Sequence, residues 1–232
     1  LFRENTFVEN IRVEDGIKFI KLSDGIEYRA KTVIIAAGSK WRQLNVPGED
    51  KLRGRGVCYC AICDGPFFKG LDIAVVGGGN SGVEAALDLS KMVKSIKVLE
   101  FTDKLNADKV LVDKLLETPN IEAITSAQVL EILGDQGVSG IKYKDRVSGE
   151  EKVVEVEGVF VEIGLVPNSQ FVEGLVELNK FKEIVVNKGC ETTVEGIYAC
   201  GDITDVPFKQ IIIASGEGAK AALSACEYLN KH

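Results

Sequence analysis

The chain has 232 residues, of which 45% are hydrophobic and 27% are charged. This is an ordinary globular composition, and it excludes the disordered, collagenous and coiled-coil classes. A net charge of −7 offers no basic surface to nucleic acid or anionic lipid. The longest aliphatic run, Val33–Ala37, is far shorter than the roughly 18 residues of a membrane helix. We therefore expect a cytoplasmic protein without nucleic-acid or membrane partners.

Apolar runs that end at or next to a glycine recur along the chain, and each predicts a buried strand followed by a turn. Helical spacing of apolar residues lies between two of these runs, at 81–93, and again at 108–117. Strands that alternate with helices indicate an α/β fold around a largely parallel sheet. The predicted strands are 32–38, 72–77, 96–100, 158–164 and 196–201.

A faint internal repeat indicates two related domains. Residues 17–38 read as two strands of alternating polarity, a turn, and an apolar strand that ends at Gly38. Residues 141–164 repeat this order and end at Gly164. The second copy also has a glycine-rich motif that begins at Gly77, well before Gly164. The same spacing in the first copy would place such a motif upstream of the first residue.

The repeat therefore predicts an α/β protein with two Rossmann-like nucleotide-binding domains. We expect three-layer sheets, with one domain inserted in the other and the outer domain truncated at its N-terminal half. The predicted bounds are 1–65 plus 187–232 for the outer domain and 66–186 for the inserted one.

The glycine-rich motif directly follows a predicted strand and opens a predicted helix. Its G-x-G-x-x-G spacing supplies glycine for a tight turn, for close approach to a pyrophosphate, and for helix–strand packing. The pyrophosphate would then lie on free N–H groups at the helix start. The alternative is a glycine-rich turn without a ligand. The predicted dinucleotide contacts are Gly77, Gly78, Gly79, Asn80, Ser81 and Gly82.

Glu100 stands at the end of the next predicted strand, about 20 residues beyond the motif. A carboxylate at this position accepts hydrogen bonds from the ribose hydroxyls of NADH and repels the 2′-phosphate of NADPH. No Arg or Lys follows it before Lys104. The sequence therefore favours NADH over NADPH. Gly164, which ends the predicted strand 158–164, is a further predicted NADH contact.

Six cysteines stand at positions 58, 60, 63, 190, 200 and 226. Cys60 and Cys63 form a C-x-x-C motif, and Asp64 follows it. This spacing favours a redox-active dithiol in a reducing compartment, because the two thiols can close a small disulfide. Asp64 could move the proton that the exchange requires. The alternative is a zinc site that includes Cys58, although a second C-x-x-C pair is lacking.

A dithiol does not accept hydride from nicotinamide directly, so NADH and the C-x-x-C motif need an adapter. A flavin accepts two electrons as hydride and passes them to a disulfide. The sequence therefore indicates FAD as a second cofactor, and the outer domain is its predicted binding site.

Together these motifs resemble the low-molecular-weight thioredoxin reductase family of flavoprotein disulfide reductases. Segments along the whole chain carry the resemblance, at 34–38, 46–49, 60–65, 77–82, 163–168 and 196–202. Within the family the chain is most similar to the flavoprotein subunits of alkyl hydroperoxide reductases, over 99–101, 143–149 and 208–221. Thioredoxin reductases proper usually carry a basic cluster for NADPH where Leu99–Phe101 stands.

The resemblance implies a role for each matched residue. Cys63 would face the flavin, Cys60 would attack the disulfide of the partner, and Asp64 would be the acid–base group. Gly201 and Asp202 would hold the ribityl chain, and the residues after Phe208 would border the flavin ring. The residues implied to contact FAD are Ala37, Gly38, Gly201, Asp202, Lys209, Gln210 and Ile211.

The implied activity is electron transfer from NADH through FAD to the Cys60–Cys63 disulfide. A peroxiredoxin or thioredoxin-like protein would receive the electrons, and the full-length protein would be a homodimer without a metal. The alternatives are a thioredoxin reductase with another partner, an NADH-binding fragment without catalysis, and a zinc-stabilised binding protein.

Overall fold

A computed structural model describes residues 2–232, which form two compact units. The inserted unit is Trp41–Gly164. The outer unit combines the chain up to Lys40 with Leu165–His232. The chain passes between the units at β5 (Ser39–Trp41) and β14 (Leu165–Pro167). The α/β class and the insertion of one unit within the other agree with the prediction.

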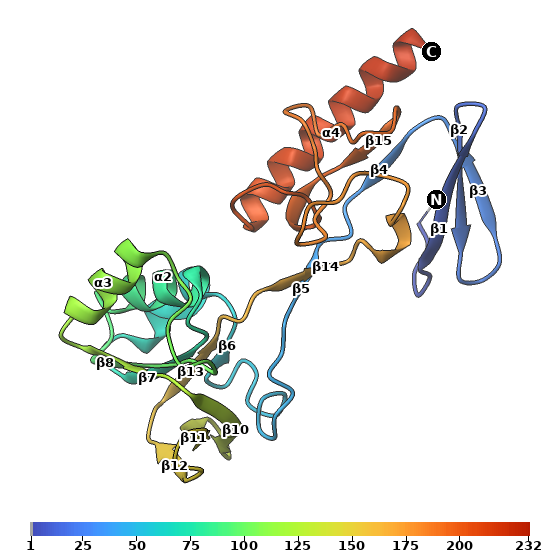
Figure 1. Ribbon diagram of the computed structural model, residues 1–232. Coiled ribbons are helices and arrows are strands. Elements are labelled where there is room, and N and C mark those ends of the chain that lie inside the picture. Colours follow the sequence, from blue (N-terminus) through green and yellow to red (C-terminus); the bar gives the residue numbers. More distant parts are fainter. Residues whose placement is uncertain (1) are drawn as a thin grey trace. The chain divides into compact units, whose positions relative to one another are not determined.

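The inserted unit is built on a five-stranded parallel sheet (Figure 1). Helices α2 (Asn80–Leu89) and α3 (Lys109–Glu117) cover one face, and a three-stranded antiparallel sheet covers the other. These are the three layers that the sequence predicts. The parallel sheet has the order β6 (Val57–Cys58), β13 (Gly158–Val161), β7 (Asp72–Val76), β8 (Ser95–Leu99) and β9 (Ile121–Ile124). The antiparallel sheet contains β10 (Ala127–Gly134), β11 (Val138–Asp145) and β12 (Glu151–Val154).

Strand β7 is apolar without alternation after its first residue, because both of its faces are covered. Ile73 and Val75 pack on the helical side, whereas Ala74 and Val76 pack toward the antiparallel sheet. A central parallel strand is buried on both faces, so all four positions after Asp72 are apolar. The helix predicted over 81–93 ends earlier, because the chain turns after Leu89 to reach β8.

The outer unit contains an antiparallel sheet of β1 (Val8–Glu14), β2 (Ile17–Leu22) and β3 (Glu27–Ala30). Strands β4 (Val33–Ile35) and β15 (Ile197–Ala199) pair in parallel, and the long helix α4 (Ile211–Lys231) packs on them. The short helical segments of the chain are α1 (Ala61–Asp64), η1 (Gly65–Phe68), η2 (Gln170–Val172) and η3 (Gly201–Ile203). None of the helices within residues 2–232 combines the length and apolarity needed to cross a membrane.

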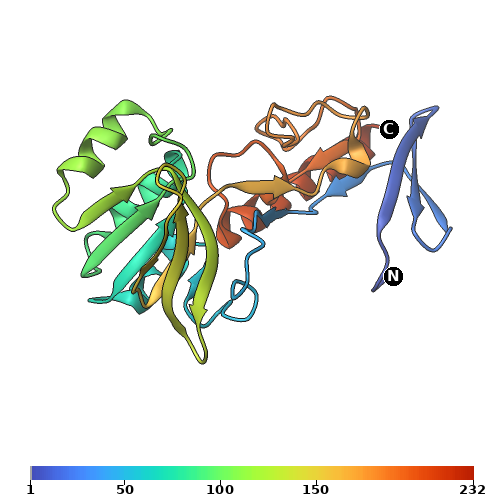
Figure 2. The ribbon, with the colours of Figure 1, turned by 60° about the horizontal axis from the view of Figure 1, so that its bottom comes forward.

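The internal repeat is present in the structure. In each unit three antiparallel strands, β1–β3 or β10–β12, precede a strand that joins a parallel sheet, β4 or β13 (Figures 1 and 2). The sequence predicted the last three strands of each copy, and the structure adds the first. The first strand pairs with the second through a register that contains a bulge in both copies.

The unit bounds differ from the predicted domain bounds after 65 and after 186. Residues 41–65 belong to the inserted unit, because Val57 and Tyr59 are buried in its core and β6 pairs with β13. Residues 165–186 belong to the outer unit, where Val172 and Ile184 are fully buried. The prediction took its bounds from the internal repeat, whereas packing divides the chain at β5 and β14.

Candidate redox and dinucleotide sites

Three neighbouring strands bring the candidate residues of the inserted unit to one edge of the parallel sheet. Strand β6 leads to Cys60, β13 leads to Glu162, and β7 leads to Gly77. The order β6–β13–β7 places the three carboxyl ends side by side. Ligands of open α/β sheets bind at this edge. The C-x-x-C motif and the glycine motif therefore share an edge, with β13 between them.

Cys60 and Cys63 form a disulfide. Helix α1 begins directly after Cys60, and the backbone N–H of Cys63 donates to Cys60 Sγ at 3.2 Å. Cys63 is exposed and Cys60 is half-buried. The disulfide is therefore accessible to an exchange partner, as a redox-active pair requires.

Asp64 lies beside the disulfide but has a partner that sequence reasoning missed. Its carboxylate lies near the thiol of Cys58, which is buried two residues before Cys60. Burial and this carboxylate raise the pKa of Cys58 to about 12. Cys58 is therefore a neutral thiol at physiological pH, beside the Asp64 carboxylate.

A groove of about 560 Å³ opens at this point. Cys60 and Asp64 line it, together with Arg53 and Tyr59. The Arg53 guanidinium lies over the Tyr59 ring, 4.9 Å from its centroid. The Tyr59 hydroxyl donates to Glu49 at 2.9 Å, which fixes this wall of the groove. The sulfur of Cys60 and the carboxylate of Asp64 are thus reached from one open face.

The glycine motif has the close helix–strand contact that its spacing predicts. A Cβ at Gly82 would lie 2.0 Å from the carbonyl oxygen of Gly77, so only glycine permits this contact of helix and strand. A Cβ at Gly79 would meet no atom within 4 Å. Helix α2 starts without a side-chain cap. Open space beside uncapped N–H groups suits a pyrophosphate.

Glu100 closes the other side of this loop. Its Oε2 accepts from the Gly78 N–H at 2.6 Å, and its Oε1 accepts from the N–H and hydroxyl of Thr102 at 2.8 and 2.7 Å. Asn106 donates its backbone N–H to the Gly78 carbonyl at 2.7 Å. Sequence reasoning missed Thr102 and Asn106, because they carry no motif and act through tertiary hydrogen bonds.

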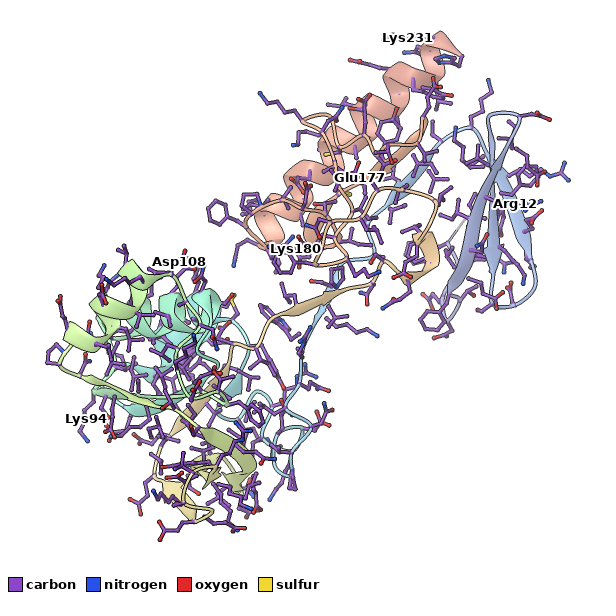
Figure 3. All side chains as sticks on the ribbon, viewed as in Figure 1. Arg12, Lys94, Asp108, Glu177, Lys180 and Lys231 are labelled. Carbon is purple, nitrogen blue, oxygen red and sulfur yellow. A yellow bond between two sulfur atoms is a disulfide. The ribbon has the colours of Figure 1, made fainter. Side chains whose placement is uncertain are left out.

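Asn80 and Ser81 differ in their surroundings. The Asn80 amide donates to the carboxylate of Asp108 at 3.1 Å and accepts from its backbone N–H at 2.8 Å. Asp108 directly precedes α3 (Figure 3), so Asn80 joins the starts of the two helices. Ser81 is exposed in the first turn of α2. Gly164, the last residue of the inserted unit, accepts from the Arg42 N–H at 3.0 Å.

The predicted FAD contacts of the outer unit come from two neighbouring strands. Ala37 and Gly38 follow β4, and Gly201 and Asp202 follow β15, so both pairs lie at the carboxyl ends of parallel strands. The Asn168 side chain donates to the Ala37 carbonyl at 2.8 Å. A Cβ at Gly38 would meet no atom within 4 Å, so the loop has room for a ligand. These residues suit a flavin nucleotide.

The segment before α4 shows a contact that was not foreseen. The Lys209 ammonium lies 2.9 Å from Glu183 and donates to the Thr204 carbonyl. Gln210 precedes the first turn of α4, and Ile211 is 89% exposed. The Lys209 ammonium is thus paired within the outer unit, whereas the Ile211 side chain is exposed to solvent.

Potential metal ligands are dispersed in the described part of the chain. No three His, Cys, Asp or Glu side chains gather there as a metal would require. Cys60 and Cys63 are bonded to each other, and Cys58 faces Asp64.

The sequence has close relatives among known proteins. It is 52% identical to the F subunit of alkyl hydroperoxide reductase from Escherichia coli K12 over 218 residues, which are 94% of this chain and 42% of that protein. It is also 52% identical to an NADH dehydrogenase of Bacillus subtilis over 210 residues, 90% of this chain and 41% of that protein. The chain thus spans about two fifths of the length of these relatives.

Solved structures share the fold. Thioredoxin reductase from Streptococcus pyogenes matches with a TM-score of 0.91 and 36% identity, over 97% of this chain and 74% of that one. Thioredoxin reductase from Giardia duodenalis also matches with a TM-score of 0.91, at 29% identity, over 97% and 74% of the two chains. These likenesses confirm the resemblance predicted from the motifs. The family model of pyridine nucleotide-disulphide oxidoreductases matches residues 3–218, and the chain belongs to this family.

Proposed function

We propose that this chain is the core of an NADH-dependent flavoprotein disulfide reductase. The observation that carries the proposal is the shared sheet edge of the accessible Cys60–Cys63 disulfide and the dinucleotide loop. Family membership supports the same chemistry, since these oxidoreductases use a flavin and a pyridine nucleotide. When bound, FAD supplies a carrier that accepts hydride and delivers electrons to a disulfide.

Each candidate residue has a defined task in this proposal. Gly79 and the first N–H groups of α2 hold the pyrophosphate of NADH, and Glu100 accepts from its ribose. Gly38 and Gly201 border FAD. Cys60 exchanges with the partner, Cys63 receives electrons from the flavin side, and Asp64 moves the proton at the sulfur. The further proposed contacts are Gly77, Gly78, Asn80, Ser81, Gly82 and Gly164 for NADH, and Ala37, Asp202, Lys209, Gln210 and Ile211 for FAD.

The proposed electron acceptor is a peroxiredoxin or a thioredoxin-like protein. The name of the Escherichia coli relative supports a hydroperoxide-reducing system. Ile62 and Phe67, on either side of Asp64, are 72% and 81% exposed, and such apolar side chains suit a protein partner. Four free cysteines suit the reducing cytoplasm, where we place this protein. We further propose that the full-length protein is a homodimer.

A thioredoxin reductase is the second candidate, because the solved structures that share the fold carry that name. The two candidates differ in the nucleotide and in the protein that is reduced. Glu100, without a basic neighbour before Lys104, favours the first.

The test is an anaerobic titration of the purified chain, supplied with FAD, with NADH. We expect the flavin absorbance to bleach and thiols to appear at Cys60 and Cys63, as detected by alkylation and mass spectrometry. Cys63→Ser has no disulfide to reduce, so it should retain bleaching and show no increase in alkylated thiols when NADH is added. Cys226→Ser, at an exposed free cysteine, should behave as wild type. Bleaching that leaves the wild-type disulfide intact would contradict the proposed route. NADH binding without flavin would favour a non-catalytic nucleotide-binding fragment.

A further inference from the structure

Glu162 is a carboxyl group at the candidate site that the proposed route does not use. It follows β13 directly, between the strand that leads to Cys60 and the strand that leads to Gly77. Its side chain is partly buried. Its own backbone carbonyl would lie 2.4 Å from a Cβ at Gly77, which shows how closely β13 approaches the dinucleotide loop.

The register of β13 and β6 brings Glu162 level with Cys60, because Phe160 pairs with Cys58 and each residue stands two positions further along its chain. The N–H of Ala61, the first residue of α1, lies near enough to the Glu162 carboxyl group to favour its ionised form. Cys60 Sγ accepts from the N–H of Cys63 at 3.2 Å. Negative charges held by one short segment oppose each other, so ionisation of one group disfavours ionisation of the other.

The protonation of Glu162 changes in the physiological range. Burial raises the pKa of Glu162 to about 7, and the Ala61 N–H opposes this rise. Among the described residues no charged side chain contributes to this pKa. The titratable groups on adjoining elements have other neighbours, since Asp64 lies near Cys58 and Glu100 binds Gly78 and Thr102.

We propose that Glu162 holds one of the two protons that accompany reduction of the Cys60–Cys63 disulfide. Two electrons break the S–S bond, one proton binds the sulfur of Cys63, and one binds the Glu162 carboxylate. The sulfur of Cys60 then stays a thiolate beside a neutral acid. Reoxidation forms the S–S bond again and releases both protons. The inference rests on the proposed function, in which the reduced flavin supplies the two electrons.

The test compares Glu162→Gln with Glu155→Gln, which removes an exposed carboxylate before β13. The chain is reduced with dithiothreitol, and the iodoacetamide alkylation rate of Cys60 is followed by mass spectrometry between about pH 5.5 and 9. In wild type and Glu155→Gln the rate profile should contain a second inflection near neutral pH. In Glu162→Gln this inflection should be lost. The pKa of Cys60 should lie about one unit below its value in wild type with Glu162 ionised, which gives about tenfold more thiolate at a pH below both values. Glu162→Asp should restore the inflection.

A second measurement uses the wild-type chain and does not depend on the folding of a variant. The carboxyl carbon of Glu162 is titrated by NMR in the oxidised and in the reduced chain. We expect the pKa of Glu162 to rise on reduction. An equal pKa in both states, or a Cys60 profile that Glu162→Gln leaves unchanged, would overturn the inference. A Cys60–Cys63 disulfide that dithiothreitol does not reduce would instead contradict the proposed function.

Discussion

The backbone N–H of Gly78 donates to Oε2 of Glu100 at 2.6 Å and joins the dinucleotide loop to the carboxylate expected to bind the ribose. The other oxygen of Glu100 accepts two hydrogen bonds from Thr102. An ionised carboxylate has about four acceptor positions, so room remains for a ribose hydroxyl. Glu100 is 8% exposed. The group that would select the nucleotide is therefore oriented before binding.

Replacement of this carboxylate tests its role in nucleotide selection. Glu100→Arg removes the acceptor for the ribose and introduces a partner for a 2′-phosphate. We expect the ratio of NADPH to NADH affinity to rise by about tenfold or more, equal to about 1.4 kcal/mol. The measurement is a fluorescence titration of both nucleotides. Glu117→Arg, at an exposed position on α3, controls for the change in net charge. An unchanged ratio in Glu100→Arg would rule out the ribose role.

Two glycines of the loop should respond differently to alanine. Gly82→Ala would place a methyl group 2.0 Å from the Gly77 carbonyl and should destabilise the inserted unit by about 2 kcal/mol or more. Gly79→Ala has open space and should cost less than about 1 kcal/mol. It should still weaken NADH binding by about tenfold or more, because the methyl group occupies the place of the pyrophosphate.

The single tryptophan of the chain, Trp41, reports the stability of these variants. It packs against the core of the inserted unit, so its fluorescence follows urea unfolding of that unit. If Gly79→Ala binds NADH as wild type does, the proposed position of the pyrophosphate is wrong.

Sequence patterns predicted the features that depend on local periodicity. The apolar run of β7, the glycine motif after it and the C-x-x-C pair are each encoded by fewer than about ten neighbouring residues, and the structure places them in the expected elements. The internal repeat was visible because both copies keep the same order of strands.

Features that depend on distant packing were not predictable. The unit bounds follow from the burial of Val57 and Ile184, which no local pattern distinguishes from other apolar residues. The contacts of Cys58 with Asp64 and of Lys209 with Glu183 join side chains whose proximity only the folded chain defines. Glu162 was overlooked because a glutamate at a strand end resembles an ordinary surface residue.

The free cysteines should differ strongly in reactivity. Cys226 is exposed, whereas Cys58, Cys190 and Cys200 are buried, and burial raises the pKa of each buried thiol. At pH 8 and with the disulfide closed, iodoacetamide should modify Cys226 at least about a hundred times faster than the buried three. Mass spectrometry of the native chain measures this order, and denaturant should abolish it. Early modification of Cys58 would contradict its burial beside Asp64.

The raised pKa of Glu162 predicts a pH dependence of stability. An unfolded glutamate has a pKa near 4.5, so between this value and about 7 the folded chain binds more protons than the unfolded one. The contribution of the neutral group is complete below 4.5 and is lost as the pH rises through 7. Wild type should therefore lose about 2 kcal/mol between pH 5 and 8 from this group, less than the full shift because the side chain is partly exposed.

Glu162→Gln should lack this share of the loss, because its amide does not ionise. Urea unfolding followed by Trp41 fluorescence at both pH values measures the difference, and Glu155→Gln should keep the wild-type loss. Equal losses in Glu162→Gln and wild type would show that the carboxyl group is already ionised at pH 5. Because this experiment needs no flavin or nucleotide, it tests the protonation of Glu162 separately from the redox chemistry of Cys60 and Cys63.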